Sequence, residues 1–268
     1  MLGRNRIVFA AVTATFIAST GFLFSPHGRP LYHATINKLQ PYTDAVTRPW
    51  TSKQRVWPAT CSERPYRVLA VGDSLTAGWV PPPEGQQPIT NPYTDQFSKI
   101  VRHALHTKNI GFTGYKADEM HQVMLDEIRL QDEPFDIFIT MGGTNDILER
   151  APEEAFDPAP VIETLKQTWT TALSHGNDTL LVVLNLLDIA YDPYLDRVLQ
   201  LNALLPEAVA SLNSSRVFLM DLHAQFTMLG KPAEEVKENW ADPVHPSENG
   251  YNIMGQLIAK QLDTLISC

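Results

Sequence analysis

The chain has 268 residues, 44% of them hydrophobic, and 21 Lys and Arg against 30 Asp and Glu give a net charge of −9. This is the composition of an ordinary globular domain with a leader, long enough to bury one sizeable core. An acidic chain lacks the basic surface that binds nucleic acid or an anionic membrane, so both classes of partner are excluded.

The first residues of the chain have the features of a targeting segment. Arg4 and Arg6 precede residues 7–24, which are uncharged and mostly apolar. Because this stretch is long for a signal peptide and short for a membrane span, residues 1–24 are predicted to be either a cleaved signal peptide or a retained signal anchor. A buried core helix is a third alternative. Either targeting role would place the rest of the chain in a lumen or outside the cell, with Arg4 and Arg6 of an anchor left in the cytoplasm.

Two kinds of residue agree with a secretory route. Asn177 and Asn213 each begin an Asn-x-Ser/Thr sequon for N-glycosylation. The chain has two cysteines, Cys61 and Cys268. Because chain ends often lie close together, we expect a disulfide between them, with two unpaired thiols as the alternative.

Residues 25–64 precede the folded region and contain several prolines and scattered aromatic residues without a sustained period, which is typical of a linker or stalk. Residues 65–268 have the pattern of one domain. Short runs rich in Val, Ile, Leu and Phe, each followed by turn or polar residues, predict buried parallel strands. These runs are Tyr66–Val71, the weaker Asn109–Phe112, Phe135–Met141, Thr179–Leu184 and Arg216–Met220.

Helical patterns separate the predicted strands. The stretch PYTDQFSKIVRHAL places Phe97, Val101 and Leu105 on one helix face. The stretches PVIETLKQTWTTAL and VLQLNALLPEAVASL are also helical, and SENGYNIMGQLIAKQLDTLI begins with Ser247 as a helix N-cap. Strands that alternate with helices predict βαβ units. The expected fold class is therefore α/β, a three-layer α/β/α sandwich in which helices cover both faces of a parallel sheet.

Polar residues follow several predicted strands, and in such sheets ligands bind beyond the carboxyl ends of the strands. Asp73 and Ser74 come directly after the first strand. The stretch GFTG, which contains Gly114, ends the weak strand, and GGTND, which contains Asn145, follows the next one. These side chains are therefore expected at one edge of the sheet.

Ser74 is the candidate nucleophile. A serine hydroxyl is a poor nucleophile at neutral pH and needs a histidine base, which in turn needs an orienting acceptor. The stretch WADPVHPSENGY supplies both, since Asp242 stands three residues before His245. Acyl transfer also needs donors for the developing oxyanion, and the candidates are the backbone N–H groups of Ser74 and Gly114 and the side-chain amide of Asn145.

Each of these residues also has a simpler explanation. Ser74 could be a helix N-cap, and Asn145 could form a turn. Asp242 could end a segment before a helix, and His245 could be an ordinary surface histidine. The presence of all these residues together favours catalysis, because four separate segments each carry the residue type needed at the edge of the sheet that binds ligands.

At these four segments the sequence resembles the SGNH hydrolases, also called GDSL-type lipases or esterases. The stretch GDSLTAG resembles the family's first block, whose serine is the nucleophile and corresponds to Ser74. The stretch NIGFTG resembles the family's glycine block, with Gly114. The stretch GGTND resembles the family's asparagine block, with Asn145, and DPVH resembles its last block, with Asp242 and His245. The resemblance extends from about residue 66 to the C-terminus. It implies a five-stranded parallel sheet and ester hydrolysis without a metal or other cofactor.

The sequence defines the substrate less closely. Trp79 opens the loop WVPPPEGQQPITNPY, whose prolines indicate a stiff rim beside the nucleophile. Tyr115 stands where the family often has a small or polar residue, and its ring would narrow the pocket. Trp240 could stack on a substrate, with ordinary core packing as the alternative. An acetylated carbohydrate, a lipid acyl ester and a thioester are all candidates, because the fold does not fix the substrate.

Two other classes of function stay open. A non-catalytic binding module could retain the fold, although it would have no need of the complete triad. A metal-dependent hydrolase could use Asp242 and His245, but no His-Glu-x-x-His or similar motif accompanies them. His103 and His106 are close together on a predicted helix, which more often marks a solvated face. Gly-Asp-Ser after the first strand, in place of Gly-x-Gly-x-x-Gly, excludes a dinucleotide-binding site.

Overall fold

The computed structural model describes residues 57, 64–82 and 85–266. The predicted leader, most of the predicted linker, and both cysteines lie outside these residues. In chain order the elements are β1 (Tyr66–Gly72), α3 (Ser74–Ala77), β2 (Trp79–Val80), β3 (Ile89–Thr90), α4 (Tyr93–Ile100), β4 (Leu105–Gly111), α5 (Ala117–Arg129), β5 (Ile137–Met141), α6 (Thr144–Leu148), α7 (Ala159–Ser174), β6 (Leu180–Leu184), α8 (Tyr194–Ser211), β7 (Val217–Met220), α9 (Leu222–Gln225), α10 (Ala233–Asn239) and α11 (Glu248–Leu265).

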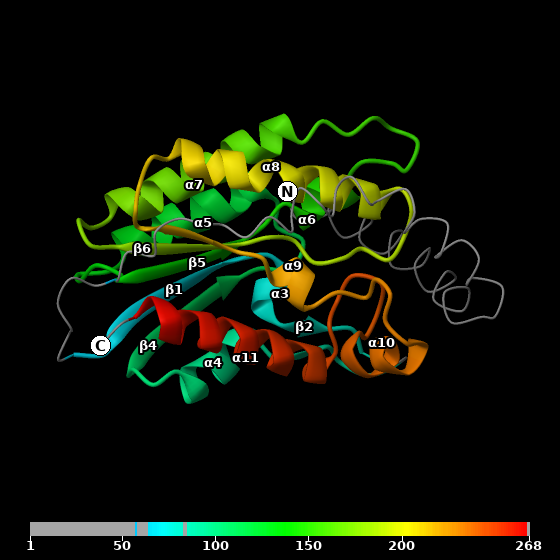
Figure 1. Ribbon diagram of the computed structural model, residues 1–268, viewed down its shortest axis with the longest axis horizontal. Helices are drawn as coiled ribbons and strands as arrows, with labels where there is room; N and C mark the ends of the chain where they lie inside the picture. Colours follow the sequence, from blue (N-terminus) through cyan, green and yellow to red (C-terminus); the bar gives the residue numbers. More distant parts are fainter. Residues whose placement is uncertain (1–56, 58–63, 83–84, 267–268) are drawn as a thin grey trace.

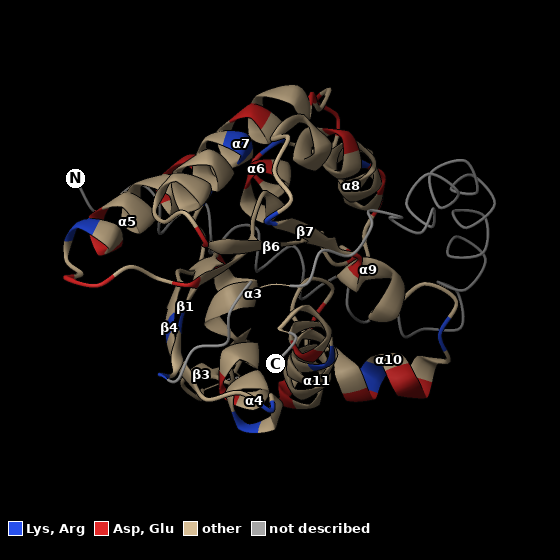
Figure 2. Ribbon diagram, turned by 60° about the vertical axis from the view of Figure 1, so that its left-hand side comes forward, with Lys and Arg blue, Asp and Glu red and all other residues tan. Residues whose placement is uncertain are grey.

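The central layer is a five-stranded sheet in the order β4–β1–β5–β6–β7, and all of its strand pairs are parallel. Helices α4 and α11 pack against each other on one face, and α5, α7 and α8 cover the other face (Figures 1 and 2). The expected three-layer α/β/α sandwich with five parallel strands is confirmed. Strands β2 and β3 form a separate antiparallel pair just beyond β1.

The inner strands form because their apolar runs are covered on both faces. Every residue of β5 and β6 is buried, and β1 has one half-buried residue, Arg67. Such strands appear in a sequence as unbroken apolar runs, which is why they were predicted within one or two residues of their ends. Their carboxyl ends meet in one row: Gly72 of β1 pairs with Gly111 of β4 and with Met141 of β5.

The prediction of one helix over PYTDQFSKIVRHAL is wrong in its second half. Helix α4 ends at Ile100, Val101 is its C-cap, and Leu105 begins strand β4. His103 therefore lies in a connection and His106 in a strand, and the two do not share a helix. The reason is that β4 is an edge strand with only one buried residue, so its polar sequence LHTKNIG lacks the apolar run of an inner strand.

Helix α11 closes the domain and begins just after the loop that carries His245. Its N-cap is Ser247, as predicted, and the hydroxyl oxygen accepts a hydrogen bond from the backbone N–H of Gly250. Tyr251, Met254 and other residues of one face are fully buried. The buried face holds the start of this helix firmly against α4 and the sheet.

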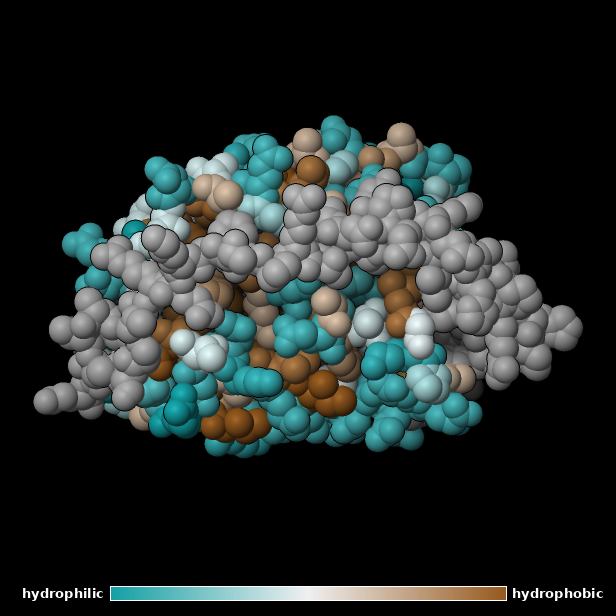
Figure 3. Space-filling model, in the orientation of Figure 1, coloured by the Kyte–Doolittle hydropathy of each residue, from teal (hydrophilic) through white to brown (hydrophobic). Residues whose placement is uncertain are grey.

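The charged residues lie mostly on the outer helices and loops (Figure 2). On the face seen in Figure 3, apolar side chains form small patches between polar ones. Within the described part of the chain, no helix combines the length and the hydropathy that crossing a bilayer would require.

Candidate active site

Ser74 lies in the tight turn that joins β1 to α3. Asp73 precedes it as the helix N-cap, and its Oδ1 atom accepts a 2.9 Å hydrogen bond from the backbone N–H of Leu75. The turn needs a glycine at position 72, because a Cβ there would lie 2.0 Å from the Thr76 hydroxyl and 2.7 Å from the Met141 carbonyl oxygen. The sequence Gly-Asp-Ser therefore forms a strand-to-helix turn with the serine at its tip.

His245 meets this serine from the far end of the chain. Its Nε2 atom lies 3.0 Å from Ser74 Oγ, and its Nδ1 atom lies 2.8 Å from Asp242 Oδ2. The other carboxylate oxygen, Oδ1, accepts hydrogen bonds from the backbone N–H groups of His245 and Val244, at 2.6 and 2.7 Å. The structure thus brings the three predicted triad residues into one hydrogen-bonded row.

The loop that holds the imidazole is closed on itself. Residues Trp240 and Pro246 form an antiparallel bridge, which brings the two ends of the loop together around Asp242 and His245. Burial disfavours a charged Asp242, but its hydrogen bond to His245, the charge of that ring and the two backbone donors outweigh burial and lower the pKa of Asp242. The carboxylate is therefore ionised at neutral pH and can orient the ring and stabilise its protonated form.

Two of the candidate oxyanion donors, Gly114 and Asn145, lie in the segments that follow β4 and β5. Gly114 has a φ of 85°, a left-handed conformation that favours glycine. Asn145 is the second residue of α6, and its Nδ2 donates a 2.8 Å hydrogen bond to the carbonyl of Tyr115. A side-chain amide has two N–H groups, so this bond engages one and leaves the other for a ligand.

The same two loops are tied to each other and to the serine turn. The backbone N–H of Phe112 donates to the Gly72 carbonyl at 3.1 Å, and that of Ala117 donates to Asp146 Oδ2 at 3.0 Å. Gly143, with a φ of 112°, turns the chain from β5 into α6. These contacts bring the segments of Gly114 and Asn145 to the edge of the sheet where Ser74 lies.

The three aromatic residues predicted to touch substrate have different surroundings. The half-buried Trp79 ring lies edge-on against His245, with ring centroids 4.5 Å apart. The half-buried Tyr115 stacks on Phe112, which is 41% exposed, with centroids 4.9 Å apart. Trp240 is only 5% exposed. Trp79 is thus in contact with the imidazole, and Tyr115 is next to Gly114.

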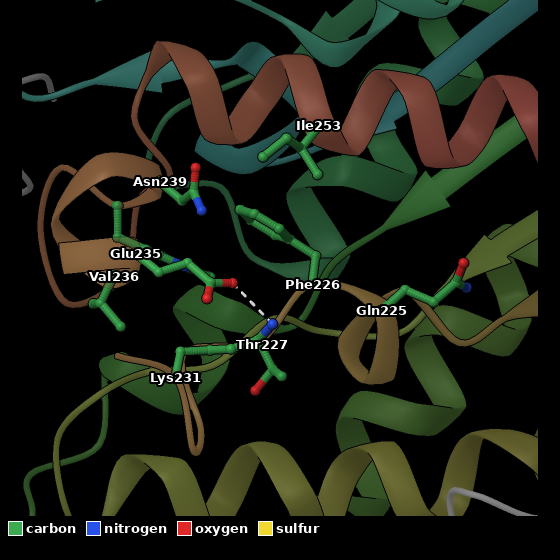
Figure 4. A pocket seen from close by; sticks show the side chains of 9 residues that line it. Gln225, Phe226, Thr227, Lys231, Glu235, Val236, Asn239 and Ile253 are labelled. Atoms are coloured by element: carbon green, nitrogen blue, oxygen red, sulfur yellow. Dashed lines mark ion pairs between the residues drawn. The ribbon is translucent and has the colours of Figure 1, made fainter. Parts of the chain in front are cut away.

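Trp240 packs away from the serine. Its ring stacks on Phe226, with centroids 5.0 Å apart and planes at 12°. Both rings line a pocket of about 90 Å³ between α10 and the start of α11, whose other walls include Thr227, Asn239 and Ile253 (Figure 4). Neither Ser74 nor His245 lines this pocket, so the surroundings of Trp240 favour the core-packing alternative over direct substrate contact.

A second buried Asp–His pair was missed by the sequence analysis. His223 Nε2 lies 2.7 Å from Asp188 Oδ1, and the two side chains are 8% and 1% exposed. The signal was present, because Asp188 follows β6 and His223 follows β7, at the same carboxyl edge as the predicted site. It was overlooked because neither residue belongs to a recognised block.

Other predicted sites are placed only in part. Asn177 and Asn213 are both exposed, and Asn213 has a positive φ of 46°. Cys61 and Cys268 are outside the described residues. Among the described residues, no three His, Cys, Asp or Glu side chains gather in a way that could hold a metal ion.

Comparisons with known proteins give the family of the chain. The sequence model of the GDSL-like Lipase/Acylhydrolase family matches residues 70–253. No curated protein matches the chain. Among solved structures, the chain is similar to a lipolytic protein of the G-D-S-L family from Veillonella parvula, with a TM-score of 0.58 and 21% identity over 73% of this chain and 97% of that one.

Two further structures have the same fold. An aryl esterase from M. smegmatis has a TM-score of 0.58 and 19% identity, over 75% of this chain and 99% of that one. A variant of an acetyl xylan esterase from Geobacillus stearothermophilus has a TM-score of 0.57 and 18% identity, over 76% of this chain and 97% of that one. With the family match over most of the domain, the chain belongs to the GDSL-like Lipase/Acylhydrolase family and is a carboxylic ester hydrolase.

Proposed function

We propose that the protein cleaves carboxylic esters through an acyl-enzyme, with Ser74 as nucleophile, His245 as general base and acid, and Asp242 as the orienting carboxylate. The observation that carries the proposal is the row of contacts from Ser74 Oγ to His245 Nε2 at 3.0 Å and from His245 Nδ1 to Asp242 Oδ2 at 2.8 Å. A buried serine in hydrogen-bond reach of a histidine that is itself held by a carboxylate is the arrangement that activates a hydroxyl.

The proposed reaction has two halves. His245 Nε2 takes the Ser74 proton as Oγ bonds to the ester carbonyl carbon, and the same nitrogen returns that proton to the alcohol oxygen as the C–O bond breaks. Water then attacks the acyl carbon with His245 again as base, the bond from that carbon to Ser74 Oγ breaks, His245 returns the proton to Oγ, and the carboxylic acid leaves. Gly114 N–H, Ser74 N–H and the second N–H of Asn145 stabilise the oxyanion, and losing one such donor costs about 3–4 kcal/mol of transition-state stabilisation.

A neutral ester fits this site best. The chain carries a net charge of −9, and two carboxyl groups belong to the site, that of Asp73, which precedes the serine, and that of Asp242, which contacts His245. These charges disfavour an anionic substrate. Because His245 returns its proton to the alcohol, the Trp79 ring that contacts His245 lies on the alcohol side, where it can pack on a sugar or another ring. We therefore propose an acetylated carbohydrate or a lipid acyl ester as substrate, and the likeness to the acetyl xylan esterase supports the first.

Labelling and turnover test the proposal together. An organophosphonate should modify wild type at Ser74, and Ser74→Ala should abolish labelling and lower kcat on p-nitrophenyl acetate by about 10⁴-fold or more. Ser98→Ala is a matched control, because Ser98 is a half-buried serine on α4 that donates to the Thr94 carbonyl, and it should keep both signals. Wild-type turnover by Ser74→Ala would contradict the assignment.

The same assay separates the remaining alternatives. A panel of p-nitrophenyl esters of rising acyl length, run beside acetylated sugars, distinguishes a small-ester from a lipid preference. A non-catalytic binding module would show neither labelling nor turnover. Loss of activity in chelator, restored by added divalent ions, would instead support a metal-dependent hydrolase.

A further inference from the structure

Asp188 is a buried carboxylate that the proposed reaction does not use. It follows β6, and its side chain is 1% exposed. Its Oδ1 lies 2.7 Å from His223 Nε2, and its Oδ2 accepts hydrogen bonds from Thr227 Oγ1 at 2.6 Å and from the backbone N–H of Met228 at 2.5 Å. One carboxylate therefore fastens α9 and the segment after it to the loop that follows β6.

The surroundings of the pair favour its charged form. Burial disfavours both charges, but the attraction between the groups outweighs it, which raises the pKa of His223 and lowers the pKa of Asp188. The backbone of His223 is fixed as well, because its N–H donates to Asn185 Oδ1 at 2.9 Å. A buried ion pair with these additional bonds imposes a defined geometry on its segments, because removing one partner would leave an unpaired buried charge.

Both segments that Asp188 joins also contact the loop of residues 240–246, which carries Asp242 and His245. Two residues beyond Asp188, the backbone N–H of Ala190 donates to the Pro243 carbonyl at 2.9 Å. On the other side, Phe226 stacks on Trp240, whose bridge to Pro246 closes the loop. Phe226 is the immediate neighbour of Thr227, and Figure 4 shows both at the pocket wall.

We propose that the Asp188–His223 ion pair is a positioning device for the catalytic imidazole, acting through Ala190 on one side of the triad loop and through Phe226 on the other. This inference rests on the proposed function, because it concerns the residues to which that function assigns the chemistry. Asp188 and His223 touch none of the reacting atoms. Their effect is to hold His245 Nε2 at hydrogen-bond distance from Ser74 and Nδ1 at hydrogen-bond distance from Asp242.

Asp188→Asn is the direct test, because the amide keeps the shape of the carboxylate and removes its charge. We expect kcat on p-nitrophenyl acetate and the rate of phosphonate labelling to fall about ten- to a hundredfold, because displacement of a catalytic group by about 1 Å can cost about a hundredfold, with KM nearly unchanged. The proton on His245 Nδ1, which gives a far-downfield NMR resonance when bonded to Asp242, should shift or broaden.

A matched control separates positioning from stability. Glu127 is a buried carboxylate on α5 that pairs with Lys108 at 2.7 Å and has no part in the triad loop. Glu127→Gln should lower the urea midpoint as Asp188→Asn does, but it should leave kcat, labelling and the downfield resonance at wild-type values.

A milder variant keeps the test decisive if Asp188→Asn does not fold. Thr227→Val removes the hydroxyl bond to Asp188, together with the 3.0 Å bond that the hydroxyl oxygen accepts from the Leu229 backbone N–H, and preserves side-chain shape. It keeps the Asp188–His223 pair, so it should give a smaller loss in the same direction. The inference would be overturned if a folded Asp188→Asn kept wild-type kcat, labelling and NMR resonance. If Asp188→Asn does not fold, the same result in Thr227→Val would overturn it. A wild-type protein that is neither active nor labelled would instead overturn the proposed function. In that case the resonance of the His245 Nδ1 proton would still report how the ring is held against Asp242.

Discussion

Asp242 is the residue whose role can be isolated most cleanly, because an asparagine can keep part of its bonding. In Asp242→Asn, the side-chain oxygen can still accept the backbone N–H groups of Val244 and His245. The amide nitrogen would then face His245 Nδ1 as a donor and hold the ring in the wrong tautomer. We expect kcat on p-nitrophenyl acetate to fall by about 10³- to 10⁴-fold with little change in KM, measured by steady-state kinetics. A loss of less than tenfold would show that Asp242 does not orient the base.

Asp73 has a different effect, on stability. Burial, against the hydrogen bond from Leu75 and the influence of Thr144 and His245, raises the pKa of Asp73 from 3.8 to about 6. Its Oδ2 atom is buried and finds no hydrogen-bond partner among the described residues. The folded protein therefore holds this proton more tightly than the unfolded chain does.

The sign of the pH dependence follows from that difference. The folded pKa lies above the unfolded one, so the contribution of Asp73 to stability is complete below pH 4 and is lost as the pH rises to 6 and beyond. The loss amounts to about 3 kcal/mol, from two pKa units at about 1.4 kcal/mol each. Asp73→Asn keeps the cap from Leu75 and cannot ionise, so its stability relative to wild type should increase by about that amount between pH 4 and pH 7. Urea unfolding at several pH values measures this, and parallel curves for the two proteins would contradict it.

At the level of elements, the start of α11 connects the fold to the site. Ser247 Oγ accepts from the Gly250 backbone N–H at 3.2 Å and donates to the Glu238 carbonyl at 2.6 Å, so it caps α11 and ties it to α10. Ser247→Ala should lower the free energy of unfolding by about 1 kcal/mol. Ser174→Ala, at the exposed end of α7, is the control and should change it by less than about 0.5 kcal/mol. Equal urea midpoints for Ser247→Ala and wild type would show that this cap is not needed.

The elements that could be predicted from sequence are those in which one physical cause dominates. The inner strands are apolar because both faces are covered, and α11 begins at a serine that caps it. Strand β4 was predicted only as a weak strand over Asn109–Phe112, and Leu105 was assigned to a helix, because an edge strand exposes its polar residues. Helix α5 was missed although Met120 and Met124 mark its buried face, since acidic and polar residues separate them. The candidate site was predictable for a related reason, because Ser74 comes just after a recognisable strand, and Asp242 and His245 stand shortly before a recognisable helix.

What could not be predicted depends on contacts between distant segments. The Asp188–His223 pair spans two loops, and neither residue is distinctive in its own segment. The bond from Asn145 to the Tyr115 carbonyl likewise joins loops from two strands. For Trp240, core packing and substrate contact were both possible from the sequence. The stacking of Trp240 on Phe226, a contact between distant segments, favours core packing. Sequence patterns show which face of an element is buried, and they do not show which loop meets which.

For the molecule as a whole, we propose a secretory route, with the catalytic domain in a lumen or outside the cell. The exposed positions of Asn177 and Asn213 are compatible with glycans. Expression in a host with N-glycosylation should give a protein whose mass falls by two glycans on treatment with peptide N-glycosidase. Asn177→Gln and Asn213→Asp should each remove one, and the aspartate is chosen because it tolerates the positive φ at position 213. A single unglycosylated species would contradict the route.

The two ends of the catalytic domain are held together, which bears on the cysteines. Trp57 and Ile266 form a parallel bridge, and the Trp57 backbone N–H donates to the Leu265 carbonyl at 3.3 Å. Cys61 and Cys268 follow shortly after these two positions in the sequence. We therefore predict that they form a disulfide, which would close a loop around almost the whole domain.

Such a bond restricts the unfolded chain more than the folded one. Its loss in Cys61→Ser should lower the free energy of unfolding by about 2–5 kcal/mol, and Cys268→Ser should have the same effect. The double variant should be no less stable than either single variant, because all three lack the same bond. Thiol titration of the denatured, unreduced wild type should find no free thiol, whereas two free thiols would exclude the disulfide and leave the bridge between Trp57 and Ile266 to join the two ends of the domain.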